Sequence, residues 1–199
     1  MTNPKATPMS SKNIPRLREN SCGLLVIDMQ ERFASVIADW QPTLQASIRL
    51  IRFFHLIQAP IVVTEQYPKG LGHTVAEIRD ALEAGGAMNC APTEKTTFSS
   101  CGSAECEKAL EAAHRDQWVL CGIETQVCVQ QTAFDLLELG RETFLAVDAI
   151  GSRRPLDREV ALERMARAGA VLSTSESLIF ETLRDSTHPL FKQASALVK

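Results

Sequence analysis

Short runs of branched apolar residues, spaced too far apart for hairpins, constrain the fold of this chain more than any other feature. Each run is uniformly apolar rather than alternating, which is typical of parallel strands covered on both faces. The segments between the runs repeat apolar residues at three- and four-residue steps, which indicates helices. Alternating strands and helices predict an α/β fold with a parallel sheet between two layers of helices. The five runs lie at 23–28, 60–65, 118–123, 143–149 and 170–174.

Two further patterns complete the expected element order. The segment EKTTFSS at 94–100 is expected to supply one more short strand, giving about six in total. The sequence STSE at 173–176 fits a capping box that starts the last helix, with Ser173 as the N-cap. Because prolines interrupt any helix near the start, we predict a flexible tail over residues 1–20 and a single domain over 21–199.

The composition is that of a globular protein with a small-molecule partner. Of 199 residues, 45% are hydrophobic and 23% are charged, which suffices for one buried core. A net charge of −3 gives no electrostatic reason to bind nucleic acid or an anionic membrane surface. No apolar stretch approaches the roughly 20 residues that span a bilayer, and no signal peptide is recognised. We therefore expect a soluble, cytoplasmic protein, although the basic N-terminal tail faintly resembles an organellar targeting segment.

The cysteines and histidines argue against disulfides and metals. Without a secretory signal, the six cysteines are expected to be free thiols in a reducing compartment. The four histidines show neither HExxH nor HxH spacing, and no CxxC pair occurs, so we predict no bound metal and no cofactor. Cys22 and Cys121 lie within expected strands and are interpreted as inert packing.

Three chemically matched residues fall at the carboxyl ends of expected strands, the edge at which open parallel sheets bind ligands. Asp28 ends one strand, Lys95 borders a second and Cys128 follows a third. Thr125 is a candidate N-cap, which would place Cys128 in the first turn of a helix, where the pKa of a thiol falls. With its charge compensated by Lys95, Asp28 is expected to accept the thiol proton.

Backbone amides at the same helix start are expected to form an oxyanion hole. The N–H groups of Glu124 and Cys128 would each contribute roughly 3 kcal/mol to a tetrahedral intermediate. Each residue of the site also has a structural interpretation: a packed cysteine, a turn aspartate or a solvated lysine. Their coincidence at three strand ends favours the functional interpretation.

Five sequence blocks occur in a specific order along the chain: LLVIDMQERF, VTEQYPKGLGHT, EKTTFSS, CGIETQVCVQQTAFDLLELG and VDAIGSR. Together they resemble the isochorismatase-like cysteine hydrolases, and most closely their isochorismatase domain-containing branch, over approximately residues 22–183. The resemblance implies a three-layer α/β/α fold with a six-stranded parallel sheet and an Asp-Lys-Cys triad at Asp28, Lys95 and Cys128. It also implies a non-proline cis peptide between Ile123 and Glu124, and assembly into dimers or larger homo-oligomers.

The resemblance further indicates substrate-side positions. Phe33 matches an aromatic wall and Gln66 a polar position facing the substrate, with core packing and a loop-stabilising hydrogen bond as the respective alternatives. Tyr67, the only tyrosine, is expected to line or cover the mouth of the site. Nicotinamidases of the family bind a metal through an Asp/His cluster after the second strand, where this chain offers only His73. Nicotinamide hydrolysis by that route is therefore not expected.

The resulting hypothesis is a cysteine hydrolase that cleaves a small amide or related acyl substrate through a thioester on Cys128. The alternative is an interaction or regulatory protein of low turnover on the same fold, because the sequence shows no legible specificity pocket. Arg153 and Arg154 could bind a substrate carboxylate or be solvated, and Asp148 is expected to order loop backbone.

Overall fold

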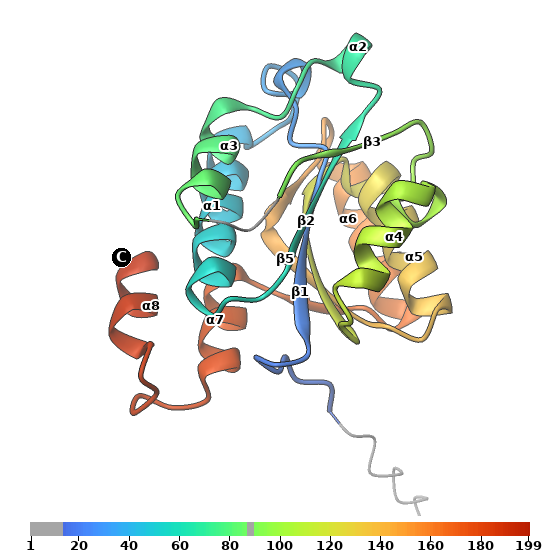
Figure 1. Cartoon of the computed structure of the whole chain (residues 1–199). Coiled ribbons are helices and arrows are strands. Elements are labelled where there is room, and N and C mark those ends of the chain that lie inside the picture. Colours follow the sequence, from blue (N-terminus) through green and yellow to red (C-terminus); the bar gives the residue numbers. More distant parts are fainter. Residues whose placement is uncertain (1–13, 87–89) are drawn as a thin grey trace, which may run out of the picture.

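A single parallel sheet forms the centre of the computed structural model, which describes residues 14–86 and 90–199. Its six strands run in the order β3-β2-β1-β4-β5-β6 (Figure 1). The predicted α/β fold with a six-stranded parallel sheet is confirmed. The strands are β1 (Cys22–Ile27), β2 (Ile61–Gln66), β3 (Thr93–Lys95), β4 (Gln117–Ile123), β5 (Glu142–Gly151) and β6 (Val171–Ser173).

Helices cover both faces of the sheet and give the three layers that the sequence predicts (Figure 1). One face carries α1 (Trp40–Leu56), α3 (Ala76–Glu83), α7 (Ser175–Leu183) and α8 (Phe191–Leu197). The other carries α4 (Ala104–Ala112), α5 (Gln130–Glu138) and α6 (Pro155–Ala168). Short elements lie in the loops: α2 (Pro68–Leu71), the 3₁₀ turns Glu31–Phe33 and Ser100–Gly102, and a π-helical turn at Thr125–Val129.

The two-sided core explains why the strands are uniformly apolar. In β1, Leu24 and Val26 belong to the apolar cluster beneath α1 and α7. Leu25 and Ile27 belong to the separate cluster beneath α4, α5 and α6. All four side chains are fully buried, so every position of the strand is removed from water.

The start of the last helix differs from the predicted capping box. Thr174 is the N-cap and its Oγ1 accepts from the Ser177 amide, whereas Ser173 stays paired in β6. Asp148 adds a second cap, because its carboxylate accepts from the Ser175 amide at 2.7 Å and from the Ser175 hydroxyl at 2.6 Å. Asp148 therefore orders backbone, as the sequence predicts.

The predicted flexible tail at 1–20 falls partly on residues 1–13, which lie outside the described residues. The remainder is held to the domain. Leu17 is fully buried and its amide donates to Glu181 Oε1 at 2.6 Å, while the Arg18 amide donates to Gln117 Oε1 at 2.7 Å. Packing thus begins at about Leu17, before the predicted boundary. Over the described residues, no helix has the length and apolar character needed to cross a membrane.

Candidate active site

The backbone around Asp28 aims its carboxylate into the sheet. Asp28 follows β1 with a left-handed φ of 52°, an unfavourable region for a residue with a side chain. Hydrogen bonds hold it there: its amide donates to Thr64 O at 3.2 Å, and its carbonyl accepts from the Gln30 amide at 2.8 Å. The residue is only 1% exposed. Its carboxylate is therefore fixed between β1 and β2, away from water.

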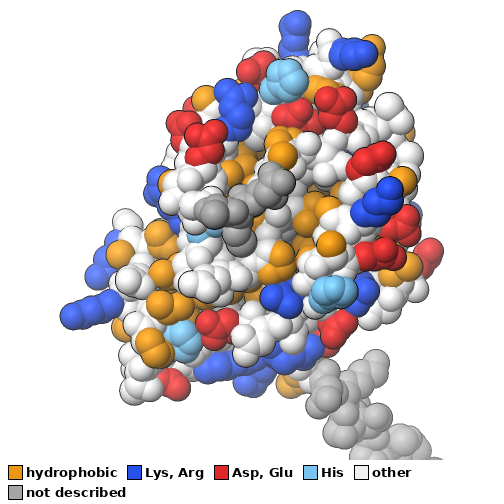
Figure 2. Space-filling model, viewed as in Figure 1, with side chains coloured by type: hydrophobic (Ala, Val, Ile, Leu, Met, Phe, Trp, Pro, Cys, Tyr) orange, Lys and Arg blue, Asp and Glu red, His pale blue; other side chains and the backbone are white. Residues whose placement is uncertain are grey.

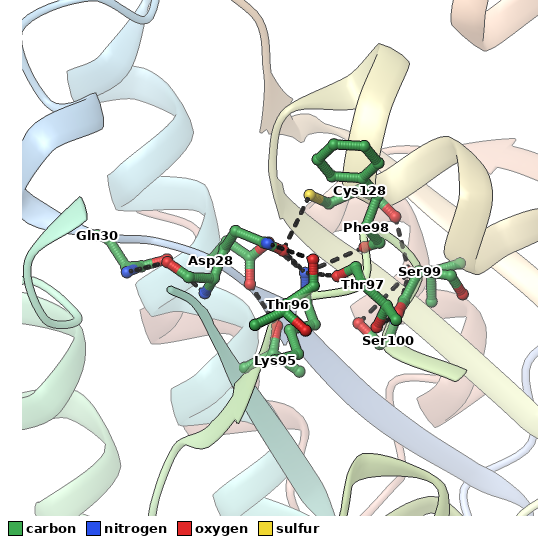
Figure 3. Close-up of polar contacts among 12 residues, drawn as sticks. Asp28, Gln30, Lys95, Thr96, Thr97, Phe98, Ser99, Ser100 and Cys128 are labelled. Atoms are coloured by element: carbon green, nitrogen blue, oxygen red, sulfur yellow. Dashed lines mark hydrogen bonds and ion pairs between the residues drawn. The ribbon is translucent and has the colours of Figure 1, made fainter. Parts of the chain in front are cut away.

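Lys95 pairs with this carboxylate from the edge strand β3. Its Nζ lies 2.7 Å from Asp28 Oδ2, and neither side chain is more than 1% exposed (Figure 3). The other oxygen, Oδ1, accepts from the Thr64 hydroxyl at 2.7 Å. A buried charge is tolerated when it is paired and hydrogen-bonded, and here both oxygens have a donor. The structure thus brings together Asp28 and Lys95 as the sequence predicts.

The Lys95 ammonium also organises the loop that follows β3. Besides Asp28, it lies 2.7 Å from Gln66 Oε1, 3.0 Å from Phe98 O and 3.3 Å from Thr97 O. An ammonium has three N–H donors, so these four acceptors use all of them. The predicted strand at 94–100 ends at Lys95, and beyond it the carbonyls of Thr97 and Phe98 turn toward the ammonium instead of a neighbouring strand (Figure 3).

Cys128 lies in the π-helical turn between β4 and α5 and is 7% exposed. Its Sγ is 4.0 Å from Gln66 Oε1, which places the thiol beside the Lys95 cluster. The predicted N-cap at Thr125 is wrong. Glu124 is the residue that precedes the turn, and the Thr125 hydroxyl donates instead to Gly151 O in β5 at 2.9 Å. Tertiary pairing with β5 has taken the hydroxyl that a local cap would use.

The acid–base state of Cys128 differs from the sequence expectation. The pKa of the Cys128 thiol is raised to about 12, because burial and, to a smaller extent, the Asp28 charge raise it more than Lys95 lowers it. Burial likewise raises the pKa of Cys22 and of Cys121 to about 12, and both side chains are fully buried, which agrees with their interpretation as packing. At neutral pH the site therefore holds a protonated thiol beside a carboxylate. This arrangement suits removal of the proton by a base during attack, rather than a preformed thiolate.

The loop before Cys128 contains the expected cis peptide between Ile123 and Glu124. The Glu124 side chain is 7% exposed and pairs with Arg153, whose Nε lies 2.6 Å from Glu124 Oε1. The carboxylate raises the pKa of Arg153. Arg154 is exposed and precedes α6. Arg153 therefore anchors the loop that carries Cys128, while its side chain stays 58% exposed, as the solvated interpretation expects.

The three predicted substrate-side residues occupy different surroundings. Phe33 is half-buried and packs on the core beneath α1. Gln66 makes a loop-stabilising hydrogen bond, because its Nε2 donates to Thr96 O at 2.9 Å, while its Oε1 accepts from Lys95 and lies 4.0 Å from the Cys128 thiol. Tyr67 is 54% exposed and lines a cleft of about 460 Å³ beside Lys95. Contact of these residues with a substrate stays a prediction.

Two buried residues that the sequence interpretation missed support the site. Thr64 holds Asp28, and Gln30 brackets the Gln66 backbone, with Oε1 accepting from the Gln66 amide at 2.7 Å and Nε2 donating to its carbonyl at 3.0 Å. A threonine inside the apolar run PIVVTE was the available signal, because a polar residue at a buried strand position needs a partner.

His73 is engaged with a carboxylate. Its Nδ1 lies 3.1 Å from Glu65 Oε2, and Glu65 Oε1 accepts from the amide and hydroxyl of Thr74. In the part of the chain that the structure describes, no group of three or more His, Cys, Asp and Glu residues is arranged to hold a metal ion. Glu65 and His73 instead fix the loop after β2.

The parallel sheet and the buried acid, lysine and thiol at its carboxyl edge define an isochorismatase-type hydrolase fold. The chain belongs to the family described as Isochorismatase domain, which matches residues 22–177.

Relatives and solved structures agree with this assignment. The chain is 41% identical over 188 residues to isochorismatase domain-containing protein 2A of Mus musculus, covering 94% of this chain and 87% of the relative. It superposes on a structure described as MAR1 ribonuclease from Caenorhabditis elegans with a TM-score of 0.86 and 41% identity, covering 92% of each chain. The YcaC gene product of Escherichia coli, described as an octameric hydrolase of unknown specificity, shares the fold with a TM-score of 0.86 and 24% identity over 94% of this chain and 91% of that one.

Proposed function

We propose that this protein is a cysteine hydrolase that cleaves a small amide or related acyl substrate through a thioester on Cys128. The observation that carries the proposal is the buried Asp28–Lys95 pair beside a thiol that burial keeps protonated. A carboxylate in that position serves as a base without a histidine, because Lys95 compensates its charge in both halves of the reaction.

The first half of the reaction forms the thioester. Asp28 takes the thiol proton as Sγ attacks the substrate carbonyl carbon, and a C–S bond forms while the carbonyl oxygen becomes an oxyanion. In this proposal, the amides of Glu124 and Cys128 hold the oxyanion. Collapse then breaks the C–N bond, and the departing amine takes the proton from Asp28.

The second half restores the enzyme. Water gives a proton to Asp28 as its oxygen attacks the thioester carbonyl, and collapse breaks the C–S bond. The sulfur then regains the proton from Asp28, and the product leaves as the acid. Lys95 supplies charge throughout but no hydrogen bond to the substrate, because its three donors are already used.

Mass spectrometry of the intact protein with short acyl esters and small primary amides tests this proposal. We expect an acyl adduct on Cys128 that hydroxylamine removes, and loss of both adduct and turnover in Cys128→Ser. Cys101→Ser is the matched control, because Cys101 is partly exposed and its pKa is also raised, to about 11. Full turnover in Cys128→Ser would remove thiol catalysis from the mechanism.

The alternative of a low-turnover interaction protein keeps one supporting observation. The cleft of about 460 Å³ is lined by residues such as Tyr67, Thr96 and Ser103, and Cys128 does not line it. Absence of any acyl adduct with every probe, together with an unreactive Cys128, would favour this alternative.

The description of the nematode structure adds RNA to the substrates to be tested. Around the end of the molecule at which the strands finish, acidic and basic side chains are interspersed, and the net charge is −3 (Figure 2). This distribution offers little counterion release on binding an anionic polymer. We therefore expect no cleavage of single-stranded RNA under conditions in which acyl esters are turned over.

We further propose that the protein is a cytoplasmic homo-oligomer. The octameric state described for YcaC supports assembly, and six free cysteines fit a reducing compartment. Light scattering across a range of protein concentrations measures the assembly directly; a constant monomer mass would refute it.

A further inference from the structure

Lys95 and Cys128 are the charged and the nucleophilic partner of Asp28, and they come from strands that are not neighbours. In the sheet order β3-β2-β1-β4, two strands separate the one that carries Lys95 from the one that precedes Cys128. With strands spaced about 4.8 Å apart, the backbones start roughly 14 Å from each other. The loops after β3 and β4 must therefore be held at a fixed separation for both side chains to converge on Asp28.

We infer that Thr132 is the positioning residue that sets this separation, an inference that rests on the proposed function of Cys128. Thr132 lies on α5 and is fully buried. Its hydroxyl donates to Cys128 O at 2.7 Å and accepts from the Ser100 amide at 2.9 Å. A hydroxyl has one donor and accepts through its lone pairs, so this single group joins the nucleophile turn to the loop of the lysine.

The Ser100 side of the link is continuous with Lys95. The Lys95 ammonium binds Phe98 O and Thr97 O, and the Thr97 hydroxyl donates to Ser99 O at 2.9 Å. Figure 3 shows this segment from Lys95 to Ser100 alongside Asp28 and Cys128. A shift of Ser100 would therefore move the acceptors that aim the ammonium at Asp28.

Ordinary helix chemistry does not account for the link. A buried threonine often donates to the carbonyl four residues earlier, and Thr182 does so in α7, where its hydroxyl lies 2.7 Å from Leu178 O. Thr182 is 4% exposed and lies on the opposite face of the sheet. The local bond is the same in both helices, so the additional bond from Ser100 is what distinguishes Thr132. Thr182 is thus a matched control.

The test compares Thr132→Val, Thr132→Ser and Thr182→Val in the full chain. The measurement is the second-order rate constant for iodoacetamide alkylation of Cys128, followed by peptide mass spectrometry from pH 6 to 10, with urea unfolding of each variant. Since small misplacements of reacting groups cost rate steeply, we expect Thr132→Val to react about tenfold more slowly at neutral pH. Thr132→Ser and Thr182→Val should stay within about twofold of the wild type, although both valine variants lose stability.

A second variant removes the donor instead of the acceptor. Ser100 is the first residue of a 3₁₀ turn and follows Ser99 in an extended conformation (ψ 137°), a setting that accepts proline. Ser100→Pro should slow the alkylation of Cys128 as much as Thr132→Val does. The double variant, with both substitutions, should be alkylated no more slowly than either single variant. This variant keeps α5 unchanged and covers the case in which Thr132→Val fails to fold.

The outcomes separate the two proposals. If wild-type Cys128 reacts no faster than Cys101, the proposed function is wrong. Wild-type Cys128 could instead be selectively reactive while Thr132→Val has the same Cys128 alkylation rate as Thr182→Val, or Ser100→Pro the same rate as the wild type. In either case the positioning role of Thr132 is wrong and the proposed function stands.

Discussion

The Asp28–Lys95 pair offers a quantitative test of how burial controls this site. We consider Lys95→Met and Asp28→Asn, singly and together. Each single change leaves one unpaired partner in a position at most 1% exposed, which typically costs 3–5 kcal/mol in the free energy of unfolding. Lys95→Met also leaves the acceptors on Gln66 and Phe98 without their donor, so its cost should lie at the upper end.

The double variant should cost much less than the sum of the two single variants, because it leaves no uncompensated charge. We expect a coupling free energy of at least about 2 kcal/mol from the double-mutant cycle. Urea unfolding at pH 7, followed by circular dichroism with the slope of the transition compared among variants, measures each term.

An exposed pair of equal length is the control for that cycle. Arg141 and Asp116 also lie 2.7 Å apart, but their side chains are 35% and 77% exposed. Solvent screening should limit their coupling to at most about 1 kcal/mol. Equal coupling in the two cycles would refute the reasoning, because it would mean that desolvation does not determine the strength of the buried pair.

Three further predictions follow from the acid–base groups and the nucleophile loop. Because Asp28 raises the pKa of Cys128, the alkylation of Cys128 in Asp28→Asn should be faster than in the wild type above about pH 10. At neutral pH it should be slower, because the base is missing. If the two curves of alkylation rate against pH do not cross, the role of Asp28 as a base is contradicted. Burial raises the pKa of Glu65, but the hydrogen bonds it accepts outweigh that effect and the net pKa is lowered from 4.5. Its stabilisation is therefore present above about pH 4.5 and lost as the pH falls through the folded-state value, so Glu65→Gln should flatten the acid side of the stability curve measured by urea unfolding. Arg153→Met should slow Cys128 alkylation several-fold by releasing the buried glutamate beside the cis peptide, whereas Arg154→Met, at an exposed neighbouring position, should leave the rate within about twofold.

The fold could be predicted from sequence because each strand has apolar side chains on both faces. Leu24 and Leu25 are adjacent and enter different cores, so the uniform run carries the information about both layers. Asp28 and Cys128 could be placed because strand ends in a parallel sheet share one edge. These inferences need only local pattern and topology.

The remaining features depend on tertiary contacts that no local pattern contains. Thr125 has the composition of a helix cap, yet its hydroxyl is used by Gly151 O, 26 residues away. The pKa of Cys128 depends on how completely the thiol is buried and on the charges of Asp28 and Lys95, and it is raised, whereas the sequence pattern suggests that it falls. The link from Thr132 to Ser100 joins segments 32 residues apart, so neither residue is marked by its own surroundings in the sequence.

The hydrogen bonds of Lys95 also define what the remaining residues must do. Its donors are used by Asp28, Gln66 and the carbonyls of its own loop, so the ammonium supplies charge and loop geometry but no recognition. In the proposed mechanism, Cys128 supplies the nucleophile and Asp28 the base. If the proposed mechanism holds, discrimination between substrates is left to groups outside the buried cluster, and we predict that Tyr67, exposed in the cleft that Lys95 also lines, contributes to it. A change at Tyr67 should accordingly alter KM among substrates, whereas the alkylation of Cys128 by a small probe such as iodoacetamide should stay unchanged.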